Sequence, residues 1–185
     1  MIQIGSPPAT IDSPIEHLVA CHRRIEQRLD TLVNAADHFT KDRQSALAAI
    51  ARSLHFLDTN GVLHTEDEEA SLFPRLRPKV SPSELAFIDT LESQHAEAES
   101  IYAELKRAAA QLNLEVDLSP DSLVHYRDCA ERLRSLYRPH IRSEDQILTG
   151  IAMRSLEESE LAGISREMRE RRAVESKSSY LTGRL

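Results

Sequence analysis

The sequence predicts an all-α protein, an up-down-up-down antiparallel four-helix bundle with a short fifth helix at its C-terminal end. Residue usage is the first reason: the 185 residues include only 5 glycines and 4% aromatics, and long stretches are rich in alanine, leucine, glutamate and arginine. The second is the presence of three Ser-Pro pairs, which are typical of helix starts. The third is an apolar residue at every third or fourth position between them, the spacing of helices with one buried face.

Five helices are expected, at 14–38, 42–76, 82–114, 120–150 and 156–172. In the first, Ser13 is the cap, and Glu16 follows it at the spacing of a capping box. The second is expected to start near residues 40–42 and to end at Pro74 and Pro78, because proline cannot continue a helix.

The remaining helices have similar signals. Ser81 and Glu84 form a second capping-box pattern at the start of the third helix, and Ser119 precedes the fourth. We expect Gly150 to interrupt the fourth helix and Ser155 to cap the fifth.

Charge and composition exclude several classes of protein. The formal net charge of −7 disfavours a nucleic-acid partner, since phosphate binding needs clustered positive charge. No run approaches 18 apolar residues, so no membrane span is expected. The N-terminal residues do not resemble a signal peptide, and Cys21 and Cys129 form no CxxC motif, so we expect a cytoplasmic protein. Residues 13–172 are expected to form one domain, and the polar residues 173–185 a flexible tail.

Each long helix carries one histidine on its apolar stripe, and in three helices a glutamate follows four residues later. These residues are His22 in the first helix, His64 and Glu68 in the second, His95 and Glu99 in the third, and His140 and Glu144 in the fourth. Residues four apart lie on one helix face, so each pair is aimed at the bundle axis. The histidines of the second and third helices also lie almost equally far from the turn between them.

This pattern predicts a metal site. Buried glutamates cost on the order of several kcal/mol each when nothing neutralises them, and the apolar stripes contain no lysine or arginine. A multivalent cation would offset both the desolvation and the mutual repulsion. Imidazole and carboxylate ligands without a thiolate suit iron or manganese better than a structural zinc site.

Neighbours of this pattern have simpler interpretations. Glu66, Asp67 and Glu69 are interpreted mainly as a solvated face, although their charge could attract cations. Asn60 and Gly61 are locally unfavourable within a helix. They predict either a kink or room for gas or solvent to reach the metal.

At these residues the chain resembles the hemerythrin-like, HHE cation-binding family of di-iron four-helix bundles. The segments HRRIEQRLDTL, HTEDEEASLFPRLRP, ESQHAEAESIYAEL and PHIRSEDQIL are similar to the family's ligand segments, and ELAGISREMRERR to its C-terminal helix. The resemblance implies two non-haem iron ions, bridged by carboxylates and by an oxo or hydroxo group. The ligands it implies are His22, His64, Glu68, His95, His140 and an acidic residue after His140. Glu144 and Asp145 both fit that last position, and Glu144 lies better on the seam.

Glu99 departs from the family pattern. Oxygen-carrying members have His-x-x-x-His on the third helix, whereas here the second position is Glu99. This carboxylate either ligates iron directly or holds an imidazole N–H. An anionic ligand would stabilise the ferric state, which argues against reversible oxygen carriage.

We therefore expect a protein that binds or reduces a small gaseous or peroxide ligand, namely oxygen, peroxide or nitric oxide. Tyr102 and Tyr137 are candidate proton donors, and peroxidase-like, catalase-like or nitric-oxide-handling activity stays open. The alternative is a non-enzymatic module for iron or oxygen sensing or for iron storage. A ferritin-like oxidase is disfavoured, because those sites use Glu-x-x-His rather than His-x-x-x-Glu. No protein partner follows from the sequence.

Overall fold

The computed structural model describes residues 11–114 and 119–182, with side chains up to residue 174, and every regular element in these ranges is helical. The α-helices are α1 Pro14–His38, α2 Arg43–Phe56, α3 Val62–Asp67, α4 Phe73–Leu76, α5 Pro82–Leu114, α6 Pro120–Ser143, α7 Thr149–Ser155 and α8 Glu158–Thr182. Three π-helical turns connect some of them: η1 Leu57–Gly61, η2 Glu68–Leu72 and η3 Glu144–Leu148. The predicted all-α class is confirmed.

The helix starts follow the predicted caps. Ser13 accepts a hydrogen bond from the backbone N–H of Glu16 at 3.3 Å, and Ser119 caps α6. At α5 the capping box is complete, because the Ser81 N–H donates to Glu84 at 2.8 Å and the Glu84 N–H donates to the Ser81 hydroxyl at 3.4 Å. Asp42 caps α2, as the predicted start near 40–42 required.

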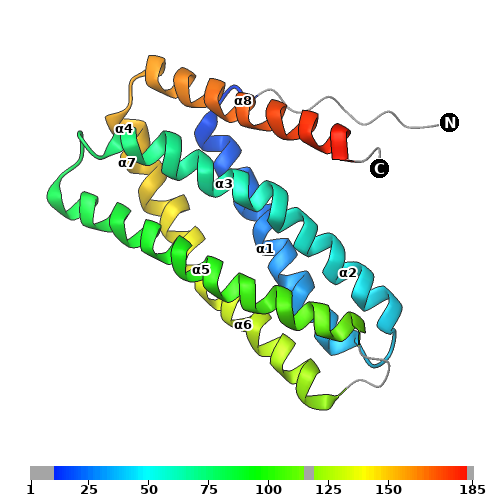
Figure 1. Ribbon diagram of the computed structural model, residues 1–185. Coiled ribbons are helices and arrows are strands. Elements are labelled where there is room, and N and C mark those ends of the chain that lie inside the picture. The colour runs from blue at the N-terminus through cyan, green and yellow to red at the C-terminus, as the bar shows by residue number, and fades with distance from the viewer. Residues whose placement is uncertain (1–10, 115–118, 183–185) are drawn as a thin grey trace.

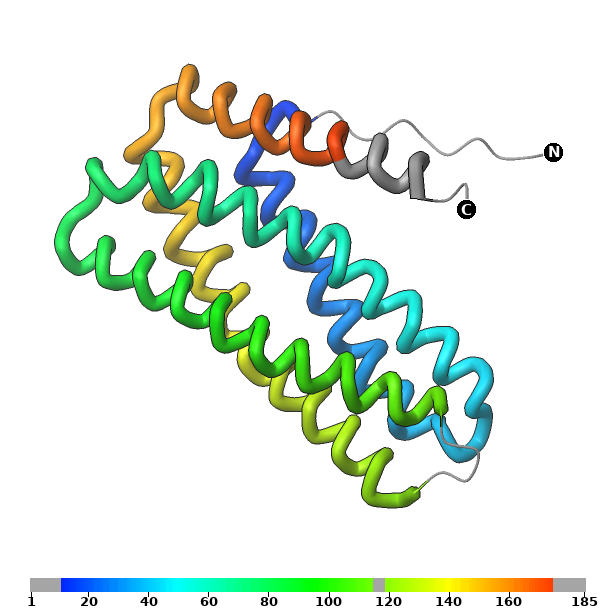
Figure 2. Tube along the Cα trace, in the orientation of Figure 1, coloured from blue at the N-terminus to red at the C-terminus, as the bar shows by residue number. Residues whose placement is uncertain are grey.

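The helices pack side by side along their lengths (Figure 1). α1 packs on α2 and α6, and α5 packs on α6, whereas few contacts join α2 to α5. One side of the bundle is therefore more open than the other three. α8 packs on α1 and α3 at one end of the molecule, as the trace in Figure 2 shows. Within the described ranges, no helix is both long and apolar enough to cross a bilayer.

The second and fourth helices of the prediction are continuous runs that contain π turns. The run from residue 43 to residue 76 includes η1 and η2, and η3 joins α6 to α7. Asn60 and Gly61 lie in η1, so the local weakness appears as a π turn. Glu68 and Glu144 each open a π turn. Such turns are common at functional sites, because the extra residue changes which side chains face inward.

Three boundary predictions near the C-terminus are wrong. Gly150 lies inside α7, because a helix tolerates glycine at a cost of about 1 kcal/mol. The break comes at Leu156, whose backbone is extended, and the Glu157 N–H is capped by Glu160 at 2.9 Å. α8 therefore starts at Glu158 rather than after Ser155, and it ends at Thr182 rather than at residue 172.

The core has two hydrophobic clusters with a polar layer between them. Along α1 the first cluster ends at Leu18 and the second begins at Cys21. On α5 the change falls between Leu91 and Ala98. In each helix the seam histidine lies at this change, so the four histidines form one layer across the bundle.

Candidate metal centre

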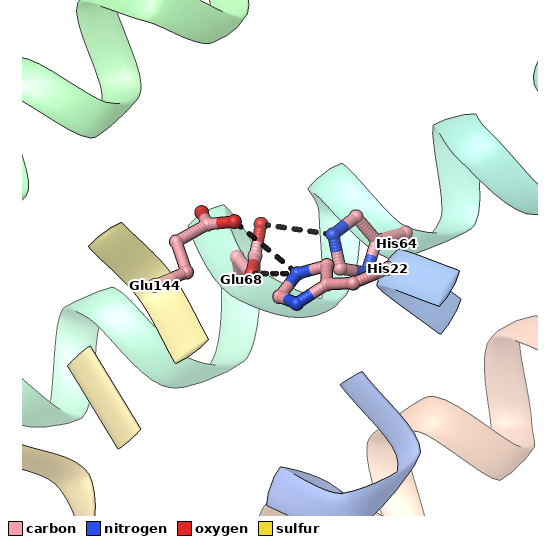
Figure 3. Close-up of side chains that lie close together, drawn as sticks. All are labelled: His22, His64, Glu68 and Glu144. Carbon is pink, nitrogen blue, oxygen red and sulfur yellow. Dashed lines mark ion pairs between the residues drawn. The ribbon is translucent and has the colours of Figure 1, made fainter. Parts of the chain in front are cut away.

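Four histidines and two glutamates meet in the polar layer, one histidine from each long helical run. They are His22, His64, His95, His140, Glu68 and Glu144, and none is more than 7% exposed. Figure 3 shows His22 and His64 facing the two carboxylates. The inward direction that the i+4 spacing predicted is therefore found for Glu68 and Glu144.

Glu68 faces three imidazoles. One carboxylate oxygen, Oε1, lies 3.8 Å from Nε2 of His22. The other, Oε2, lies 3.6 Å from Nε2 of His64 and 3.5 Å from Nε2 of His95. The single carboxylate of Glu68 thus reaches histidines from three helices, α1, α3 and α5.

Glu144 lies between the same groups from the opposite helix. Its Oε2 is 3.2 Å from Nε2 of His22, and its Oε1 is 3.0 Å from Nε2 of His140 and 3.8 Å from that of His95. The donors fall into two sets that share Glu144, one with His22, His64 and Glu68 and the other with His95 and His140. This arrangement has the donors for two cations with a carboxylate between them.

Three of the imidazoles are oriented by acceptors on their outer nitrogen. Nδ1 of His22 is 2.7 Å from Asp145, and Nδ1 of His95 is 2.8 Å from Glu69. Nδ1 of His140 is 2.8 Å from the side-chain oxygen of Gln94. Because each partner accepts, Nδ1–H donates, and Nε2 is the ring nitrogen that faces the centre and can bind a metal.

Two consequences follow for charge. The Nε2 atoms of His95 and His140 are 3.0 Å apart, and two lone pairs at that distance need a positive charge between them. Both oxygens of Glu68 and of Glu144 are buried without a hydrogen-bond partner among the described residues. A bound cation would satisfy all these atoms, so the donor set fits a metal.

Local electrostatics favours protons on two of the donors. Burial opposes charge on His22, but the carboxylates of Glu144 and Glu68 raise its pKa to about 11. Burial, and then the charge of Glu144, raise the pKa of Glu68 to about 8. Burial, and then the charge of His22, lower the pKa of His64 well below its usual value. His64 is therefore neutral, as a ligand must be, whereas His22 and Glu68 must lose a proton to bind a metal.

The two acidic residues after His140 have different positions. Glu144 is in the centre, while Asp145 accepts from His22 and also pairs with Arg23 at 2.8 Å. His64 differs from the other three histidines, because its buried Nδ1 has no partner within the described residues.

The expectation that Glu99 points into the core is wrong. Its side chain is exposed and belongs to neither donor set. On α5 the buried face continues from His95 to Ala98, three residues on, so Glu99 is turned toward the open side of the bundle. The partner that α5 provides instead is Gln94, which the sequence analysis did not identify.

The expectation that Asp67 lies on a solvated face is also wrong. It is 0% exposed and pairs with Arg171 and Arg172 of α8, both at 2.7 Å. Arg171 also donates to Ser71, so α8 holds both sides of the turn that carries Glu68. No local pattern shows this, because the pairing depends on where α8 packs.

Of the two tyrosines, only Tyr137 lies at the centre. Its ring is edge-on to His140, with the centroids 5.9 Å apart. The Tyr102 hydroxyl donates instead to the Leu54 carbonyl at 3.0 Å and to Asp58 at 3.1 Å.

Comparison with known proteins agrees with this geometry. The family model of the hemerythrin HHE cation-binding domain matches residues 13–152. The chain belongs to this family. An uncharacterized protein of Haemophilus influenzae is 30% identical over 141 residues, which cover 75% of this chain and 78% of that protein. The hemerythrin match includes every residue of the centre and leaves out α8, whose arginines hold Asp67.

Proposed function

We propose that this up-down-up-down hemerythrin-like bundle holds two non-haem iron ions and uses them to bind or reduce a small oxidant. The observation that supports it most is the convergence of the buried carboxylates of Glu68 and Glu144 on the Nε2 atoms of four histidines, at 3.0 to 3.8 Å. Imidazole and carboxylate donors without thiolate favour iron over a structural zinc ion. When bound, the iron pair would supply the electrons for reduction of oxygen, peroxide or nitric oxide.

The surroundings suit a small ligand. A cavity of about 10 Å³, roughly the space of one water molecule, lies against His22, Glu68 and Glu144. Apart from Thr149, its other walls are apolar, with Leu18 and Leu72 among them. This space admits one atom of a small ligand at the centre, mostly among apolar side chains.

Tyr137 is the candidate proton donor. Burial, and then the charge of Glu144, raise the pKa of Tyr137 above its usual value, so its hydroxyl keeps its proton at neutral pH. Because Glu99 is exposed, α5 contributes one imidazole only, and the set that contains His95 has three donors against four in the other. Glu99 therefore no longer argues against oxygen carriage.

The test is iron analysis followed by anaerobic reduction and addition of oxygen, peroxide or nitric oxide. We expect about two irons per chain, loss of iron in Glu68→Ala, and no loss in His55→Ala, an exposed histidine of the same run. Repeated consumption of one oxidant in the presence of excess reductant, monitored by visible absorption, supports an enzyme. A single stoichiometric change without turnover supports the sensing or storage alternative. A folded wild-type protein that takes up no iron would overturn the proposal.

A further inference from the structure

The open side of the bundle contains a large groove that reaches His95, one of the donors of the metal centre. It has a volume of about 510 Å³ and lies between the η1–α3 segment and α5. Gly61 and Thr65 line one wall and Ala96 and Ala103 the other, and His95 is also among its lining residues. We call this the open groove. It is far larger than an entering diatomic molecule requires.

The open groove is acidic, and most of its charges have partners. Asp58 pairs with Lys106 at 2.9 Å, and Glu92 pairs with Arg77 at 2.7 Å. The lysine in the lining is therefore neutralised locally.

Two carboxylates of the lining remain unpaired. Glu66 of α3 and Glu99 of α5 have no ion-pair or hydrogen-bond partner among the described residues, and both are exposed. They come from the two opposite walls. Two uncompensated negative charges across an open groove attract cations and repel anionic ligands.

A succession of oxygen donors continues inward from these two residues. Glu69 also lines the open groove and accepts from Nδ1 of His95 at 2.8 Å. On the other side of the same ring, Nε2 of His95 lies 3.5 Å from the buried carboxylate of Glu68. An ion that enters by this route meets exposed carboxylates first, then a half-buried one, and then the full donor set.

From these observations we propose that the open groove is the entry path for divalent cations, with Glu66 and Glu99 collecting the ion at the mouth. Glu99 thus acts in delivery of the metal rather than as a ligand. This inference rests on the proposed metal-binding function, and it names the route by which the centre is loaded. A neutral oxidant needs no such charge, whereas a divalent cation gains from it at every step.

The test is the rate of metal uptake by metal-free protein mixed with Fe²⁺ under anaerobic conditions, or with Co²⁺, in a stopped-flow instrument. The variant is Glu66→Gln with Glu99→Gln. The matched control is Glu97→Gln with Glu170→Gln, two exposed residues outside the open groove that change the net charge equally. At low ionic strength we expect the groove variant to load about tenfold more slowly than the control, because charged clefts raise association rates by about 10- to 1,000-fold. High salt should bring the two rates together.

The final metal content separates this inference from the proposed function. Equal stoichiometry in the wild type, the groove variant and the control, with slow loading in the groove variant alone, supports the path. Equal loading rates in the groove variant and the control would overturn it, even if two ions bind. A wild-type chain that binds no metal would overturn the proposed function as well.

Discussion

Individual side chains of the centre carry protons that compete with a metal. His22, with a pKa raised to about 11, and Glu68, with a pKa raised to about 8, both hold a proton near neutral pH. The two residues belong to the same donor set, and Nε2 of His22 lies 3.8 Å from Oε1 of Glu68. Metal binding and proton loss are therefore linked at these two residues.

The first prediction concerns this linkage. Binding of Fe²⁺ near neutral pH should release about two protons per chain, because His22 and Glu68 must both be deprotonated to become ligands. Since raising the pH removes the competing protons, the apparent affinity should rise with pH through the pKa of Glu68. Anaerobic calorimetric titration in two buffers with different ionisation enthalpies measures the number released. An affinity that does not change with pH would refute the linkage.

At the scale of elements, α8 and the π turns place the carboxylates. η2 begins at Glu68, and the residue before it, Asp67, is fixed by two arginines of α8. Ser71, in the same turn, donates to Glu167 of α8 at 2.6 Å. The helix outside the family match thus holds the turn that carries a central donor.

The second prediction is that Asp67→Ala destabilises the protein by about 3 kcal/mol, the lower end for a broken buried ion pair, because both arginines are partly exposed and can hydrate. Urea denaturation measures the free energy of unfolding. Glu66→Gln, at the exposed neighbouring position, should change it by less than about 0.5 kcal/mol. Equal effects of the two substitutions would contradict the role given to the contact with α8.

At the scale of the whole molecule, the polar layer divides the core. Hydrophobic clusters lie on both sides of it, and each of the four long helical runs crosses it at a histidine. The layer buries carboxyl groups whose charge is balanced only by protons, such as those on His22 and Glu68, so it weakens the core until a cation replaces these protons. Bound metal should therefore stabilise the packing of the four helical runs as well as take part in the reaction.

The third prediction is a large effect of metal on thermal stability. At a free metal concentration about 1,000 times the dissociation constant, binding stabilises the folded state by about 4 kcal/mol, which corresponds to a rise of about 10 °C in Tm. Differential scanning calorimetry with iron and with a chelator measures this rise. Glu144→Ala, which removes the carboxylate shared by both donor sets, should abolish most of it. The same rise in that variant would show that the metal acts elsewhere.

Many structural features of this protein are determined by residues that are close together in the sequence. The Ser-Pro starts and the capping box at Ser81 and Glu84 depend on residues within one turn, so the sequence alone predicted the helices and most of their starts. The inward direction of the seam histidines and of Glu68 and Glu144 follows from helical periodicity, which is also local.

Other features depend on how the helices meet. Helical spacing alone predicted that Glu99 lies on the seam. In the structure α5 is rotated so that Glu99 faces the open side of the bundle, where α5 makes few contacts with α2. Asp67 is buried only because α8 brings two arginines from about a hundred residues further along the chain. The outer partners of the imidazoles, Gln94 and Asp145, likewise lie on helices other than those of the rings they hold. The sequence by itself determined which residues can be metal donors. Helix packing decided which of them meet, because contacts between elements set the rotation of each helix and the position of the distant arginines.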